Sequence, residues 1–264
     1  MSERAIQQLF DLSGRTVLIT GGTGFLGSAM SRALAEAGAS VIISSREQSR
    51  AHTAAAALPT PKGQTHYGVE LDHMEPDRCD AWFARAVECT GQIDALINNG
   101  NEAVGADVTN VTTEQFNRQL ANATGYFTLS RLFHDHIVAR GTTGSIVLLG
   151  SMYGVVGSYP DAYAGICVAS PVGYHALKGG IIHMARHLAV YWAASGVRVN
   201  CLSPGPFPSE KAPQAMVERL CGKSPMGRMG RPEEVKGAIV FLVSEASSYV
   251  TGQNLLVDGG WTAW

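Results

Sequence analysis

The chain has 264 residues, of which 45% are hydrophobic and 16% charged, with a formal net charge of −2 at pH 7. This composition allows a large buried core, and the near-neutral charge without a Lys/Arg-rich stripe gives no reason to expect nucleic-acid binding. No apolar run approaches the length of a membrane span, and residues 1–11 lack the apolar centre of a secretory signal, so we expect a cytoplasmic protein with no membrane partner. The five cysteines are odd in number and form no CxxC pair, so we expect reduced thiols.

The first recognisable unit is a strand, a glycine-rich turn and a helix. Residues 15–20 predict a short buried strand, and residues 28–37 have the periodicity of a helix. Between them, backbone N–H groups can meet a pyrophosphate because glycine permits close approach. A second apolar strand at residues 40–44 completes the unit expected for a dinucleotide site. The turn residues expected to bind the cofactor are Gly21, Thr23, Gly24, Phe25, Leu26 and Gly27.

The residues after the second strand indicate the choice of cofactor. An acidic residue there would accept hydrogen bonds from the ribose hydroxyls and repel a 2′-phosphate. This chain has Ser44, Ser45 and Arg46 instead. Ser45 removes the repulsion and Arg46 can bind a phosphate, which favours NADP, with NAD possible. Arg46 could equally be a solvated residue that opens the next helix.

Strands and helices alternate along the remaining chain. Strands are predicted near residues 65–69, 93–98, 145–149, 197–202 and 254–257, and helices near residues 75–90, 113–139, 173–194 and 232–244. Strands joined by helices of this length form a parallel sheet that is covered on both faces. We therefore predict an α/β fold with a doubly wound parallel sheet of the Rossmann type, as a single domain over residues 1–264, with ligands at the carboxyl ends of the strands.

Tyr174 and Lys178 suggest hydride-transfer chemistry. Residues four apart on a helix share one face, so the Lys178 ammonium can lie beneath the Tyr174 ring. A fixed cation there would lower the pKa of the phenol and make it a usable proton donor or acceptor near neutral pH. Many helices contain such a pair by chance, so the assignment depends on further landmarks.

Those landmarks occur in order along nearly the whole chain. They are Thr20-Gly21 with Gly27, Asp72, Asn98-Asn99-Gly100, Asn122 with Gly125, Gly150-Ser151, Tyr174 with Lys178, Asn200 with Pro204-Gly205, and Val257-Asp258-Gly259-Gly260. On these residues the chain resembles the single-domain branch of the short-chain dehydrogenase/reductase family. The overall pattern and the tail that ends at Trp264 are most similar to its gluconate 5-dehydrogenase-type members.

The resemblance implies a role for each matching residue. Tyr174 would be the acid/base, and Ser151 would hydrogen-bond the substrate oxygen. Lys178 would lower the Tyr174 pKa and bind the nicotinamide ribose, while Asn122, interrupting its helix, would hold a water that relays protons. Asp72 would accept the adenine amino group. The other residues expected at the cofactor, besides Tyr174 and Lys178, are His73, Asn99, Gly100, Pro204, Gly205, Phe207 and Ser209.

Two departures from the family pattern concern the cofactor site. Gly21, Gly24 and Gly27 have the spacing of the extended branch, with Phe25 where the single-domain branch usually has glycine. The chain lacks the longer C-terminal substrate region of that branch, so the shorter branch is retained. Gly100-Asn101 stands where Ala-Gly is usual, which can reshape the wall beside the ribose.

A third departure concerns the substrate. The spacing between Ser151 and Tyr174 is longer than usual, which predicts a substrate loop near residues 152–173, and residues 206–225 are expected to form a lid that is mobile over 210–225. Hydroxyls and the Asp161 carboxylate in that loop can pair with a polyol, and the loop has no Lys or Arg for an anionic substrate. Its tyrosines, Tyr153, Tyr159 and Tyr163, could instead pack the loop or face a partner subunit.

The sequence thus predicts an NADP-dependent oxidoreductase that interconverts a secondary alcohol and a ketone on a sugar, sugar acid or polyol. The alternatives are a dehydrogenase of surface-sugar biosynthesis and a catalytically silent nucleotide-binding regulatory protein. His183 and His187 lack a third ligand, so no metal site is expected. Trp261 and Trp264 in the tail are suited to an interface, and together with the helices that carry Asn122 and Tyr174 they predict a homotetramer.

Overall fold

A seven-stranded sheet forms the centre of the computed structural model, which describes residues 3–264. All strands are parallel and follow the order β3-β2-β1-β4-β5-β6-β7. The strands are β1 Thr16–Ile19, β2 Ser40–Ser45, β3 Tyr67–Glu70, β4 Ala95–Asn98, β5 Gly144–Leu149, β6 Val197–Pro204 and β7 Asn254–Val257. The central strands β1, β4 and β5 are buried along their whole length, as expected for a parallel sheet with both faces covered.

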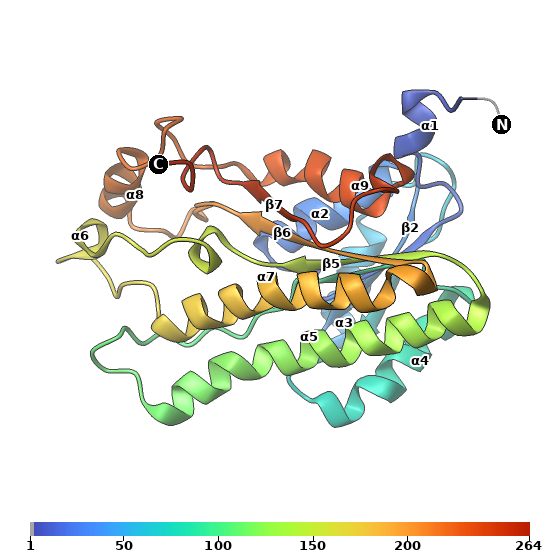
Figure 1. Ribbon diagram of the computed structural model, residues 1–264, viewed down its shortest axis with the longest axis horizontal. Helices are drawn as coiled ribbons and strands as arrows, with labels where there is room; N and C mark the ends of the chain where they lie inside the picture. The colour runs from blue at the N-terminus through green and yellow to red at the C-terminus, as the bar shows by residue number, and fades with distance from the viewer. Residues whose placement is uncertain (1–2) are drawn as a thin grey trace.

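Helices pack on both faces of this sheet (Figure 1). One face carries α2 Phe25–Glu36, α3 Gln48–Ala56 and α9 Lys236–Val243, and the other carries α4 Cys79–Thr90, α5 Thr113–Arg140 and α7 Val172–Trp192. The short helices are α1 Ile6–Phe10, α6 Pro160–Tyr163 and α8 Gln214–Cys221. Two separate apolar cores follow, one on each side of the sheet. No helix within residues 3–264 combines the length and apolarity needed to cross a membrane.

The predicted α/β architecture is confirmed, and the differences lie mainly between its elements. Helix α3 lies where Arg46 was said to be able to open a helix, but its bounds were not predicted, because its sequence has little amphipathic contrast. Helix α8 occupies the segment expected to be a mobile lid. The third strand begins and ends later than predicted, at Tyr67 and Glu70, and α2 begins three residues earlier than predicted, at Phe25.

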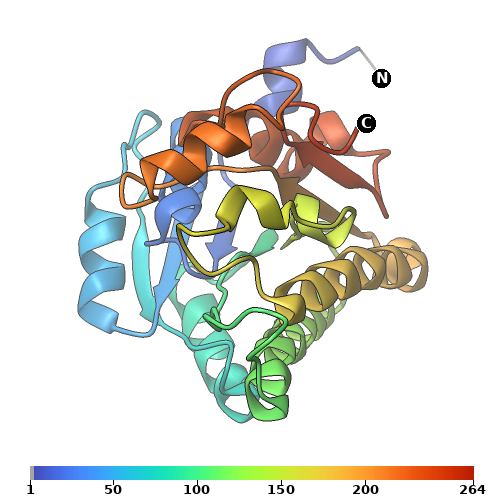
Figure 2. The same ribbon diagram turned by 90° about the vertical axis from the view of Figure 1, so that its left-hand side faces the viewer.

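The parallel sheet brings the candidate residues to one edge. Gly21 follows β1, Asn99 follows β4 and Ser151 follows β5, so all three lie at carboxyl ends of strands. Figure 2 looks onto this end of the molecule, where α6 and α8 lie in front of the sheet. The candidate site is therefore a product of the topology, and the helices at its mouth come from segments far apart in the chain.

Candidate active site

The glycine turn after β1 is closed tightly against the segment after β4. Gly21 has a φ of 60°, in the left-handed region that favours glycine. A Cβ atom there would lie 2.9 Å from the Gly100 Cα atom, and a Cβ atom on Gly27 would overlap the Gly21 backbone oxygen. The start of α2 can therefore approach this turn only because these positions are glycine, which leaves its first N–H groups facing the cavity in front of it.

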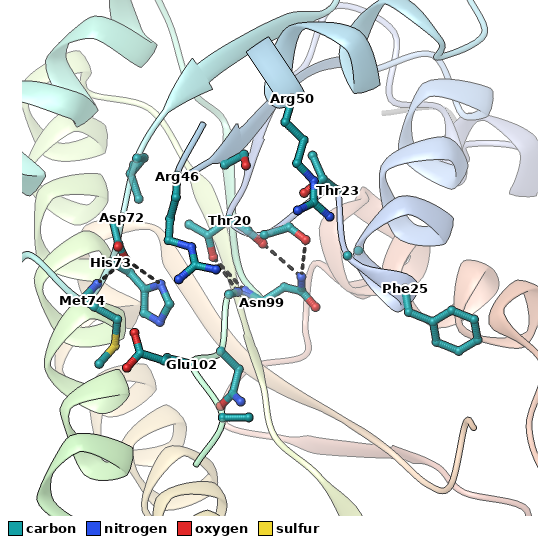
Figure 3. A pocket seen from close by; sticks show the side chains of 18 residues that line it. Thr20, Thr23, Phe25, Arg46, Arg50, Asp72, His73, Met74, Asn99 and Glu102 are labelled. Carbon is teal, nitrogen blue, oxygen red and sulfur yellow. Dashed lines mark hydrogen bonds and ion pairs between the residues drawn. The ribbon is translucent and has the colours of Figure 1, made fainter. Parts of the chain in front are cut away.

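Thr20 and Asn99 hold the two segments together (Figure 3). The Thr20 hydroxyl oxygen accepts hydrogen bonds from the backbone N–H groups of Asn99 at 2.9 Å and Gly100 at 3.0 Å. The Asn99 amide donates in return to the backbone oxygens of Thr20 and Gly21, both at 3.0 Å. This reciprocal set fixes the shape of the turn before any ligand arrives.

A cavity of about 510 Å³ opens in front of this turn, within the size range of ligand pockets. Most residues predicted to bind the cofactor line it: Gly21, Thr23, Gly24, Phe25, Gly27, Ser45, Arg46, Asp72, His73, Asn99 and Gly100. Leu26 does not, because its side chain packs against the apolar core. The glycine cradle and the cationic side chains beside it fit a dinucleotide with a phosphorylated ribose.

One cation in this cavity was not predicted from the sequence. Arg50, on α3, lines it together with Arg46 (Figure 3). Neither guanidinium forms an ion pair with another residue in the described part of the chain, whereas Glu102 on the same wall is bound by Arg118, which lowers the pKa of that carboxyl. The signal for Arg50 was its position four residues after Arg46, on the helix that Arg46 was said to be able to open, but no bounds were predicted for that helix.

A second cavity, of about 490 Å³, contains Ser151 and Tyr174. Its walls come from the residues after β4, from the loop 152–173 and from Gly205 to Pro208. The lining is mostly apolar and includes Met152, Met216 and Met229. The two residues expected to hold and protonate the substrate oxygen therefore share one pocket.

Lys178 lies behind Tyr174 and is only 3% exposed. Its Nζ atom donates to the Leu149 backbone oxygen at 2.6 Å and lies 5.5 Å from the centre of the Tyr174 ring. Burial lowers the pKa of Lys178 to about 8. The ammonium is thus placed near the phenol but is bound by the backbone.

The predicted lowering of the Tyr174 pKa by Lys178 is not found in this structure. Burial raises the pKa of the Tyr174 phenol, and the neighbouring Ser151 hydroxyl opposes that shift. The physical reason is that burial removes part of the hydration that a phenolate needs. Access of a polar group to the phenol oxygen is therefore needed before Tyr174 can act as a base.

The prediction that Asn122 interrupts its helix is wrong. Helix α5 runs through it without a break, and the side chain is fully buried. Its Oδ1 atom accepts from the Glu102 backbone N–H at 2.8 Å, and its Nδ2 atom donates to the backbone oxygens of Glu102 at 3.1 Å and Gln119 at 2.9 Å. Asn122 therefore ties α5 to the segment after β4, because its side chain finds partners inside and outside its own helix.

The loop 152–173 folds into a roof over the second cavity. The Tyr153 and Tyr163 hydroxyls lie 2.7 Å apart, and the Tyr159 ring packs edge-on against Trp261 at 5.4 Å. Asp161 does not face the cavity, contrary to its expected contact with a polyol. It is exposed and pairs with Lys223 at 2.9 Å, because the turn that follows α8 places this cation on the outside of the loop.

Only two of the four residues expected at the nicotinamide end line the substrate cavity. Gly205 and Phe207 line the substrate cavity, whereas Pro204 is part of strand β6. Ser209 is exposed and lines neither cavity. Gly205 is required by packing, since a Cβ atom there would lie 2.5 Å from the Asp258 Cα atom. Across residues 3–264, no cluster of three or more His, Cys, Asp or Glu side chains could hold a metal ion.

Comparisons with known proteins agree with this geometry. The family model described as Enoyl-(Acyl carrier protein) reductase matches residues 24–262. Among curated relatives, the ribulose-forming D-arabinitol 2-dehydrogenase of Scheffersomyces stipitis is 34% identical over 97% of this chain and 96% of its own length. The L-tagatose-forming galactitol 2-dehydrogenase of Cereibacter sphaeroides is also 34% identical, over 97% of this chain and 98% of its own.

A solved structure extends the likeness to three dimensions. The gluconate 5-dehydrogenase of Burkholderia cenocepacia J2315, in complex with NADP and tartrate, superposes with a TM-score of 0.88 at 30% identity, covering 98% of this chain and all of its own. The chain belongs to the short-chain dehydrogenase/reductase family, and it is an oxidoreductase of that family's single-domain type.

Proposed function

We propose that the protein is an NADP-dependent oxidoreductase that interconverts a secondary alcohol and a ketone on a sugar, sugar acid or polyol. The observation that carries the proposal is the placement of Ser151 and Tyr174 in one cavity, with Lys178 buried behind them and the glycine cradle beside them. A bound nicotinamide supplies the hydride acceptor or donor. The protein supplies orientation and the proton.

In this proposal Ser151 and Tyr174 act on the same oxygen of the substrate. The Ser151 hydroxyl holds it within reach of the Tyr174 phenol, which gives or takes the proton. Lys178, bound to the Leu149 backbone oxygen, stabilises the phenolate when it forms. Asn122 keeps the wall between the two cavities in place through its bonds to Glu102.

The preference for NADP is supported by two cations at one end of the cofactor cavity. Arg46 and Arg50 both face the space beyond β2, where a 2′-phosphate belongs. A guanidinium binds phosphate with paired, charge-assisted hydrogen bonds. The gluconate 5-dehydrogenase with the same fold was solved with NADP.

The substrate class is supported by what the relatives are named for. Arabinitol and galactitol are polyols, and gluconate is a sugar acid. In this chain Tyr153, Tyr163 and Ser170 line the second cavity, and their hydroxyls can serve a polyhydroxylated chain.

A second candidate substrate is favoured by the same lining. Methionine and aliphatic side chains contribute much of the wall, including Met152, Val168 and Leu220. Such a surface suits a ketone or alcohol on an apolar ring or alkyl frame, because burying apolar area is favourable and methionine adapts to irregular shapes. Comparing a polyol with a cyclic aliphatic alcohol of equal size would separate the two candidates.

We further propose that the enzyme is a cytoplasmic homotetramer. The exposed apolar side chains of Phe127, Val190 and Tyr191 on α5 and α7, together with Trp264 in the tail, support self-association. The free cysteines support a reducing compartment. Light scattering at micromolar concentration tests the assembly, and a monomeric mass would contradict it.

A screen of substrates tests the reaction itself. Polyols and sugar acids are incubated with NADP or NAD while the absorbance of the reduced nicotinamide is followed. The proposal expects turnover with at least one of them and higher catalytic efficiency with NADP. Binding of NADP without turnover of any alcohol or ketone would favour a regulatory protein instead.

A further inference from the structure

His73, three residues after the end of β3, is enclosed by two glycines from neighbouring segments. A Cβ atom on Gly125 of α5 would overlap the His73 backbone oxygen, and one on Gly100 would lie 2.9 Å from the His73 Nδ1 atom. The imidazole is 10% exposed, on the wall of the cofactor cavity. Helix α5 and the segment after β4 therefore close tightly around this side chain.

The bonds of Asn122 determine which nitrogen of His73 carries a proton. The Asn122 Oδ1 atom is identified as oxygen because the Glu102 backbone N–H donates to it, while Nδ2 donates to two carbonyl oxygens. The His73 Nε2 atom lies 2.8 Å from that oxygen and so must be the donor. In a neutral imidazole the other nitrogen, Nδ1, is then an acceptor.

That acceptor is left without a partner in the protein. The Nδ1 atom makes no hydrogen bond to any residue from 3 to 264, and the Asp72 carboxylate, 4.0 Å away, pairs with it only when the imidazole is protonated. His73 follows β3, the neighbour of β2, and β2 ends at the cations expected to meet the ribose phosphate. Its free edge thus faces the adenosine half of the cavity (Figure 3).

We propose that His73 has two roles: its Nε2–H fixes Asn122 and the wall at Glu102, and its Nδ1 accepts a hydrogen bond from a hydroxyl or amino group of the adenosine half of the cofactor. This inference rests on the proposed use of a nicotinamide cofactor. It assigns to the side chain a role in both the cofactor cavity and the catalytic helix. Gly100 is part of the same arrangement, because any side chain there would meet the imidazole.

The charges around His73 make this role dependent on pH. Burial lowers the pKa of His73, and Lys178 on α7 acts in the same direction. Asn122, Asp72 and Glu102 oppose the shift, and the Tyr126 ring packs at 6.0 Å from the side of α5. The neutral form therefore prevails at neutral pH, and protonation in acid converts Nδ1 from an acceptor into a donor.

Binding of NADH to wild type, His73→Gln and His73→Leu tests the proposal. NADH is the probe because it lacks the 2′-phosphate, which itself titrates near pH 6. Glutamine keeps a donor and an acceptor but does not titrate, whereas leucine has neither. At neutral pH, His73→Leu should bind NADH about five- to tenfold more weakly than wild type, the effect of about one hydrogen bond, and His73→Gln should bind nearly as well. As the pH is lowered stepwise into the acid range, binding should weaken in wild type and stay level in His73→Gln.

A second comparison keeps the test independent of folding in the leucine variant. Gly100→Ala should weaken NADH binding in the wild-type background and be tolerated with His73→Val, because the smaller side chain leaves room for the methyl. Three results would each overturn the proposal. Gly100→Ala could weaken NADH binding equally in the wild-type and His73→Val proteins, His73→Leu could bind NADH as tightly as wild type, or His73→Gln could keep the acid dependence of binding. Failure of wild type to bind NADH or NADPH would overturn the proposed function as well, so the two failures are distinguishable.

Discussion

The ammonium of Lys178 lies 5.5 Å from the centre of the Tyr174 ring. It is held there by the Leu149 backbone oxygen and has almost no contact with solvent. Burial disfavours both a charged lysine and a charged phenol, so each group needs a polar partner to stabilise its charged form.

Removing the phenol oxygen should abolish turnover and spare the fold. Tyr174→Phe keeps the ring in the substrate cavity but has no proton to give, so kcat should fall by roughly two to four orders of magnitude. The dissociation constant of NADPH should change by less than about threefold, because Tyr174 lines the second cavity and not the first. Activity comparable to wild type would show that another group is the base.

Replacing Lys178 should change how stability depends on pH. The folded protein releases the Lys178 proton near pH 8, whereas the unfolded chain keeps it up to the model value of 10.5. Between these values the unfolded state binds more protons, so the free energy of unfolding of wild type should rise with pH, and Lys178→Met should lack that rise. The gap between the two proteins should change by up to about 3 kcal/mol across the window. Urea unfolding of both proteins at pH values below and above this window measures the gap. If the free energy of unfolding changed with pH in the same way in both proteins, the buried Lys178 ammonium would be contradicted.

Removing Arg50 should weaken NADP binding selectively. Arg50→Ala should raise the dissociation constant for NADP about tenfold, corresponding to about 1.4 kcal/mol, with little change for NAD. Arg85→Ala is the matched control, because Arg85 is exposed on α4 and lines neither of the two cavities of the site.

Ser45→Asp with Arg46→Ala should move the preference towards NAD, since a carboxylate repels the phosphate. A wild-type protein that already prefers NAD tenfold would show that these arginines have another role.

The two tail tryptophans should have separable effects. Trp261 is 1% exposed and packs against Tyr159 in the roof, whereas Trp264 is 72% exposed. Trp261→Ala should open the roof and raise the KM for substrate while NADPH binding is kept. Trp264→Ala should leave KM unchanged and should lower the mass found by light scattering. An unchanged KM in Trp261→Ala would mean that the roof does not bound the substrate.

The parallel sheet and the position of the site were predictable because they depend on local signals. Apolar runs separated by helical periods specify a parallel sheet, and Gly21, Asn99 and Ser151 then fall at the same edge by topology alone. Arg50 was missed because α3 has a weak amphipathic pattern, although its alanines have high helix propensity. Contacts between distant segments were not predictable: Asp161 faces outward because Lys223, far along the chain, attracts it.

Burial reversed one chemical prediction. Spacing alone placed Lys178 on the same helix face as Tyr174, which is confirmed, but spacing carries no information about hydration. The structure shows that enclosure raises the phenol pKa more than its neighbours lower it. Sequence patterns therefore identify the reacting groups more reliably than their protonation states.

The most direct test of the account follows NADPH formation by wild type and Tyr174→Phe with arabinitol, galactitol or gluconate as substrate. The account predicts an increase in absorbance of the reduced nicotinamide with wild type and at least one of these substrates, higher efficiency with NADP than with NAD, and no measurable increase with Tyr174→Phe under the same conditions. Equal rates for wild type and Tyr174→Phe, or no oxidation of any of these alcohols by a wild-type protein that binds NADP, would contradict it.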